Sequence, residues 1–119
     1  MGLHYRMFAS SATARGTLGV QCWVRNNTSN FVLYSQSVSP RLMAVVLRFP
    51  GRRIDEKAQN SRPWSITLAV IVAHAPTSQA TPADKGEFYD SLVSLRSKLL
   101  SKHGQNLRIL VLGDFNAKL

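Results

Sequence analysis

Three polar residues that suit phosphate chemistry stand directly after two apolar runs of the chain. Asp114 and Asn116 are two residues apart in a Gly-Asp-Phe-Asn segment that follows the run 107–112, and His74 follows the run 66–73. A carboxylate can activate a water molecule or bind a metal ion, an amide can donate to a phosphoryl oxygen, and histidine exchanges a proton near neutral pH. We therefore take His74, Asp114 and Asn116 as candidate catalytic residues.

Each of these residues also has a purely structural interpretation. Gly-Asp-x-Asn after a strand is a common setting for an Asx-type turn, and a lone histidine at a strand end is often a half-buried or capping residue. If the backbone stays extended instead, Asp114 and Asn116 point the same way and Phe115 packs on the opposite face. Gly113 would free the backbone to turn as the strand ends.

The elements that must position these residues are a strand, a helix and a second strand. The runs 66–73 and 107–112 predict strands, and the first is apolar throughout, as in a strand covered on both faces. Between them, Thr81 as N-cap, Pro82 at the first helical position and Gly104 as the stop predict a helix over 83–102. Its apolar face comprises Phe88, Leu92, Leu95 and Leu99, with Ser91 and Lys98 outside.

This order predicts that the candidate residues meet in space. Two parallel strands joined by a helix form a right-handed crossover in nearly all proteins, and both strands then end at the same edge of the sheet. Ligands of open α/β sheets bind outside the carboxyl ends of strands. We expect His74, Asp114 and Asn116 to lie together there and to open onto a cleft.

The remainder of the chain predicts mainly strands. Apolar or β-branched runs at 17–24, 31–38 and 41–49 are separated by polar turns, which favours an antiparallel meander. The charged segment 51–63, bounded by glycine and proline, is expected to be an exposed loop. Residues 1–14 are expected to be poorly defined.

Composition limits the class of protein. The 119 residues suffice for one small domain, with 45% hydrophobic residues, and no apolar run approaches the length of a membrane span. The first residues have no apolar signal-peptide core, and the single cysteine, Cys22, excludes an internal disulfide. We therefore expect an intracellular rather than a secreted protein, and we expect no membrane partner. The sequence leaves the oligomeric state open.

Charge favours a nucleic-acid partner. The formal net charge is +9, and residues 1–54 contain seven arginines and no Asp or Glu. A surface of one sign attracts phosphate-rich partners through counterion release. Such a charge can instead serve solubility, or belong to a piece of a larger protein whose acids lie elsewhere.

The segments VAHAPTSQATPADKGEFYDSLVSLRSKL and RILVLGDFNAKL resemble the endonuclease/exonuclease/phosphatase family. That family includes pancreatic deoxyribonuclease, apurinic endonucleases and the endonuclease domains of non-LTR retrotransposons. The residue pattern is most similar to that of craniofacial-development-protein-like and retroelement members. The resemblance covers 15–119, as a partial domain, and is strongest over 70–119.

This resemblance implies an α/β fold in which two β-sheets pack face to face with helices outside, as in deoxyribonuclease. It implies a Mg²⁺-dependent phosphodiesterase acting on DNA or RNA. Asp114 would orient or activate the nucleophile, Asn116 would bind the scissile phosphate, and His74 would be a phosphate ligand.

Departures from the family pattern imply an incomplete site. Many relatives read Asn-x-Tyr where this chain has Val72-Ala73-His74, and the family's metal-binding Glu lies upstream, where residues 1–54 have no acid. The family's closing Asp-His pair lies well downstream of Asn116. We therefore expect a truncated, catalytically incomplete member that binds Mg²⁺ poorly. The alternatives are a non-catalytic basic nucleic-acid-binding module, and a small α/β protein in which Gly-Asp-Phe-Asn is only a turn.

Overall fold

The structure, a computed structural model, describes residues 4–11, 19–55, 60–104 and 106–116, with only the backbone described at 52–55 and 60–63. Its strands and helices follow one another in the order β1 (Tyr5–Ala9), β2 (Gln21–Arg25), α1 (Asn26–Ser29), β3 (Val32–Ser39), β4 (Leu42–Asp55), β5 (Asn60–His74), α2 (Pro82–His103) and β6 (Leu107–Asp114). The protein is therefore α/β, as predicted.

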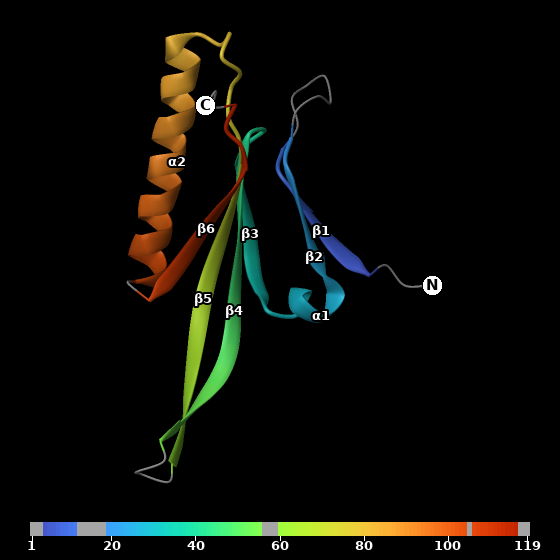
Figure 1. Cartoon of the computed structure of the whole chain (residues 1–119), viewed down its shortest axis with the longest axis vertical. Helices are drawn as coiled ribbons and strands as arrows, with labels where there is room; N and C mark the ends of the chain where they lie inside the picture. The colour runs from blue at the N-terminus through green and yellow to red at the C-terminus, as the bar shows by residue number, and fades with distance from the viewer. Residues whose placement is uncertain (1–3, 12–18, 56–59, 105, 117–119) are drawn as a thin grey trace.

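The strands form two sheets (Figure 1). β1 and β2 pair antiparallel in a two-stranded sheet, while the other strands form a mixed sheet in the order β3-β4-β5-β6. β3, β4 and β5 pair antiparallel in sequence, and β5 pairs parallel with β6. The last pairing, made across α2, confirms the predicted strand-helix-strand unit.

Local signals explain where α2 begins and ends. The Thr81 side chain accepts a hydrogen bond from the Asp84 backbone N–H at 3.1 Å, and Pro82 occupies the first turn. Gly104, at φ 81°, donates its N–H to the Leu100 carbonyl at 2.8 Å. A residue with a side chain would adopt this left-handed conformation less readily, so glycine suits the helix end. Among the described residues, no helix has the length and apolar character needed to cross a membrane.

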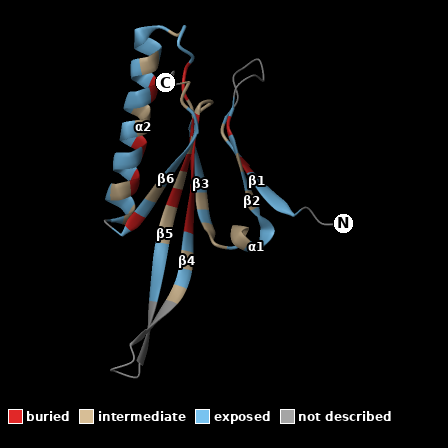
Figure 2. Ribbon diagram, in the orientation of Figure 1, coloured by how far each residue is buried: buried red, intermediate tan, exposed pale blue. Residues whose placement is uncertain are grey.

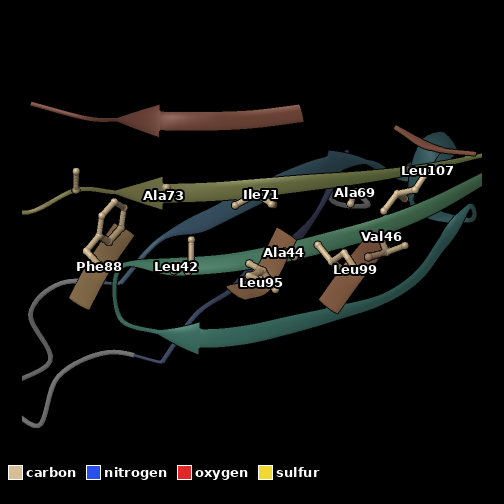
Figure 3. Close-up of a cluster of buried hydrophobic side chains, with 11 residues drawn as sticks. Leu42, Ala44, Val46, Ala69, Ile71, Ala73, Phe88, Leu95, Leu99 and Leu107 are labelled. Carbon is tan, nitrogen blue, oxygen red and sulfur yellow. The ribbon is translucent and has the colours of Figure 1, made fainter. Parts of the chain in front are cut away.

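A first cluster of buried side chains fills the space between α2 and the four-stranded sheet (Figure 3). Phe88, Leu95 and Leu99 of α2 are at most 6% exposed, which confirms three positions of the predicted face. Leu92 is half-buried against the same cluster, and Ser91 is also half-buried rather than outside. The cluster's sheet residues are Leu42, Ala44, Val46, Ala69, Ile71, Ala73 and Leu107, with Ala75 just beyond β5.

The opposite face of the same sheet carries a second cluster. Met43, Val45 and Leu47 of β4 pack there with Phe8 of β1 and Val20, next to β2. β4 is thus covered on both faces, and its residues Leu42 to Val46 are fully buried (Figure 2). In β5, Ala69 and Ile71 belong to the first cluster, whereas Val70 and Val72 pack partly buried against the second. The expectation of a strand covered on both faces is confirmed for this part of β5.

The predicted three-strand meander is wrong in its first member. β2 pairs with β1 rather than with β3, and α1 lies in the polar segment between β2 and β3. β1 itself lies in residues 1–14, to which the sequence analysis assigned no element. Hydrophobic patterns indicate that a segment is extended, but they do not specify which strand it pairs with. The sequence pattern therefore does not show that β2 and β3 belong to different sheets.

The predicted loop over 51–63 is also wrong, except at 56–59, which lie outside the described residues. β4 and β5 continue to pair through this segment, from Gly51↔Trp64 to Asp55↔Asn60. Gly51 permits this because a Cβ there would lie 2.5 Å from the Trp64 ring. Glycine, proline and charged residues are common in loops, but this composition does not exclude a pair of strands that continue to a hairpin.

An aromatic contact ties the end of α2 to edge strand β3. The Tyr34 hydroxyl and His103 Nε2 lie 2.6 Å apart, and the two rings stack at 5.8 Å between centroids. The Lys102 ammonium lies 4.2 Å from the Tyr34 ring centroid, a cation–π contact. Burial, followed by the positive charges of Lys102 and Arg48, lowers the pKa of His103 from its ordinary value of 6.5.

Replacing Leu95 by alanine should lower the free energy of unfolding by about 2–5 kcal/mol, because the site is a packed core that cannot fully collapse. Urea unfolding measures the loss. Leu92→Ala, at the half-buried neighbour, should lose clearly less. Equal losses at the two positions would contradict the assigned helix face.

Acid should destabilise the protein through His103. Since its folded pKa is lowered, the unfolded chain binds the proton more readily, so stability is fully present above pH about 6.5 and falls as pH drops below that value. Unfolding curves between pH 8 and 5, as an order-of-magnitude window, should show that His103→Gln reduces this fall. Lys102→Gln should reduce it in part, by removing one cause of the shift. An unchanged pH profile in both variants would contradict the assignment.

Candidate functional site

The carboxyl edge of the four-stranded sheet brings His74 and Asp114 together. His74 is the last residue of β5 and Asp114 the last of β6, and they are register partners in the parallel ladder. One residue on, the Ala75 N–H donates to the Asp114 carbonyl at 2.8 Å. Figure 1 shows both strands ending beneath the loop that leads into α2. The crossover thus places the predicted histidine and acid side by side.

Asn116 belongs to the same edge, but its geometry differs from the extended backbone considered above. Its φ is 50°, its backbone N–H donates to Asp114 Oδ1 at 2.8 Å, and its Nδ2 donates to the Ala75 carbonyl at 2.7 Å. This is the Asx-type turn of the structural interpretation. Phe115 packs partly buried against the first buried cluster. The Asp114 carboxylate therefore accepts from the Asn116 backbone, and the Asn116 side chain bonds to Ala75 instead of projecting in parallel with Asp114.

A fourth polar residue at this edge, Arg41, was missed by the sequence analysis. Its Nη1 donates to the carbonyls of His74 and Ala75 at 3.2 and 3.3 Å, and its own carbonyl accepts from the His74 N–H at 2.8 Å. Arg41 precedes β4, which runs antiparallel to β5, so the start of β4 meets the end of β5. An antiparallel pairing of 41–49 with 66–73 would have identified it, but the sequence analysis predicted a loop between these runs instead.

Gly113 is required by close backbone approach. Its φ is 153°, and a Cβ on this residue would lie 1.7 Å from the carbonyl oxygen of Ala73, its register partner on β5. The glycine therefore does more than allow a turn after the strand. It permits β6 to stay paired with β5 up to the candidate site.

The hollow described near this edge does not open onto the three candidate residues. A hollow of about 260 Å³ near this edge is lined by Arg41, Pro76, Asp84, Glu87 and others, but not by His74, Asp114 or Asn116. Alternation along β5 explains the difference: Ala73 faces α2, so His74 falls with Val70 and Val72 on the opposite face. The hollow is walled by α2 residues and thus lies on the other side of the sheet.

The described residues do not complete a magnesium site. Among them, no three His, Cys, Asp or Glu side chains are grouped closely enough to hold a metal ion. Mg²⁺ demands an octahedral oxygen shell and is usually bound by one or two carboxylates together with substrate phosphates. Asp114 supplies one carboxylate, and its Oδ1 already accepts from Asn116. The described edge can offer a phosphate the His74 ring beside the Asp114 carboxylate.

Comparison of the chain with protein-family models, curated proteins and solved structures found no match.

Gly113→Ala should destabilise the protein by about 3 kcal/mol or more, because the added Cβ meets backbone atoms at a strained φ. Gly86→Ala is the matched control. Gly86 lies in α2 with nothing within 4 Å of the built Cβ, so alanine there should add about 0.5–1 kcal/mol. Chemical denaturation of both variants measures the contrast, and a tolerated Gly113→Ala would contradict the close approach.

Proposed function

We propose that this chain is a partial member of the endonuclease/exonuclease/phosphatase type and that the carboxyl edge of its sheet binds nucleic-acid phosphate. The observation that carries the proposal is the parallel register of His74 with Asp114, produced by the crossover through α2. The family resemblance assigns phosphate contacts to residues at this point of the chain. The finer deoxyribonuclease-like arrangement, with two sheets face to face, is supported by the second cluster, in which β1 and the start of β2 contact the main sheet.

Charge supports a phosphate partner. The chain carries a net charge of +9, and Arg41 lies at the edge where His74 ends β5. The Arg41 guanidinium is anchored through Nη1 to two backbone carbonyls, which fixes its position beside the strand end. A fixed guanidinium is well suited to phosphate oxygens because its donors form a rigid fork.

Binding without hydrolysis is the activity proposed for this chain. The Asn116 amide, expected to bind the scissile phosphate, instead donates to the Ala75 carbonyl, and Asp114 accepts from the Asn116 N–H. Residues 1–54 contain no carboxylate to serve as the upstream metal ligand of the family. In this proposal, Asp114 and Asn116 hold the described edge together rather than carry out hydrolysis.

A non-catalytic basic nucleic-acid-binding module is the second candidate. The observation that favours it is the absence of acids from residues 1–54 alongside seven arginines. In that case binding spreads over the basic surface and does not depend on the sheet edge, so substitution of His74 separates the two candidates.

Fluorescence anisotropy with a short labelled DNA or RNA tests the proposal. Affinity should fall at least about tenfold between roughly 50 and 200 mM salt, because phosphate binding releases counterions. His74→Ala should weaken binding about threefold or more, because it removes one hydrogen bond to the charged phosphate. His4→Ala, at an exposed histidine before β1, is the matched control and should bind like the parent chain. Equal affinity of His74→Ala and the parent would favour the second candidate, and salt-independent binding would refute both.

A nuclease assay with Mg²⁺ tests separately the proposal that the chain does not hydrolyse nucleic acid. The chain and its Asp114→Ala variant should give the same background cleavage. Cleavage by the chain that is abolished in Asp114→Ala would overturn the view that the site is incomplete.

A further inference from the structure

β6 is an edge strand without the features that usually protect such an edge. It has eight residues, no proline and no lysine, and it keeps an uninterrupted register with β5. Within the described part of the chain no strand pairs with its outer side. Long, regular, apolar edge strands tend to add a further strand, because their outer N–H and C=O groups lack ladder partners.

The other edge of the sheet, β3, is built differently. Its pairing with β4 is interrupted by two register shifts, between Val32 and Tyr34 and between Ser37 and Ser39. Its middle is polar, with Ser35, Gln36 and Ser37 in sequence. Irregular pairing and polar side chains discourage edge-to-edge association. The contrast identifies β6 as the associating edge of this sheet.

The apolar residues of β6 are also left uncovered. Leu110 and Leu112 are 45% and 49% exposed, and they are register partners of Val70 and Val72, which pack against the second buried cluster. Leu110 and Leu112 therefore continue that apolar face beyond the part covered by the β1–β2 sheet. An exposed extension of a buried face indicates a contact with another surface.

We propose that this surface pairs with β6 of a second copy of the chain, antiparallel about a twofold axis at Val111. The residue types on the exposed face are self-complementary: Arg108, Leu110, Leu112 and Asp114 read positive, apolar, apolar, negative. Antiparallel pairing about Val111 sets Arg108 opposite Asp114 of the second copy, and Leu110 opposite Leu112 of the second copy. A twofold interface requires this reciprocal match, and opposite charges and apolar pairs across strands both stabilise a sheet.

The pairing joins the two four-stranded sheets into one and gives the candidate site a new neighbour. Each Asp114 then lies opposite Arg108 of the second copy, so a guanidinium approaches the edge where His74 and Asp114 meet. The net charge of +9 on each copy opposes association at long range. At about 0.15 M salt the screening length is about 8 Å, which weakens that repulsion more than the close pairs.

A charge-swap series on the full chain, followed by sedimentation equilibrium without nucleic acid, tests the proposal. The parent chain should form a concentration-dependent dimer. Arg108→Asp and Asp114→Arg should each weaken it at least about tenfold, since each places like charges opposite one another. The double variant, with both substitutions, should restore the dimer because the pairs are reversed but complementary. Arg96→Asp makes the same charge change on the exposed surface of α2 and should leave the dimer intact.

Three outcomes would overturn the proposal: a parent chain that stays monomeric at high concentration, single variants that dimerise like the parent, or a double variant no better than the single ones. Circular dichroism and urea unfolding of each variant check that the fold is retained. Sedimentation measures mass and needs no nucleic acid. A chain that does not dimerise would therefore leave the proposal of phosphate binding standing, and a chain that does not bind phosphate would leave the proposal of a dimer standing.

Discussion

The ladder between β4 and β5 is the interaction on which the rest of the structure depends. It is the longest pairing in the described chain, from Leu42↔Ala73 to Asp55↔Asn60, and β4 is covered on both faces along its buried half. Because the ladder is antiparallel, it sets the start of β4 beside the end of β5, which brings Arg41 to His74. Both buried clusters, and the edge that carries the candidate site, are organised around this one pair of strands.

The polar groups at the carboxyl edge join three segments of the backbone. Arg41 and Asn116 both donate to the Ala75 carbonyl, and Ala75 in turn donates to the Asp114 carbonyl. These bonds fix the turn between β5 and α2 and the end of β6 in one network. The Asn116 amide is thereby engaged by the backbone, which accords with the proposal of binding without hydrolysis.

Sequence reasoning succeeded where a local signal and the burial pattern agreed. Thr81, Pro82 and Gly104 delimit α2 through backbone capping, and apolar residues at helical spacing identified Phe88, Leu95 and Leu99 as core. It failed where the outcome depends on pairing between distant segments, as in the partner of β2 and the continuation of β4 past Gly51. In the site, topology predicted the meeting of His74 and Asp114. The Asx-type turn between Asp114 and Asn116 was one of the two alternatives that the local pattern offered, whereas the bond from the Asn116 amide to the Ala75 carbonyl joins distant segments and could not be predicted.

The parallel pairing of β5 with β6 also has a kinetic consequence. The β3–β4 and β4–β5 contacts join segments that follow one another along the chain, so these hairpins can form early. β6 can join β5 only after the whole of α2 has been placed, with about forty residues separating His74 from Asp114. Contacts between distant segments form late because loop closure costs entropy before they contribute any stability. The candidate site should therefore be among the last parts of the chain to assemble, and a folding intermediate would contain β4 and β5 without it.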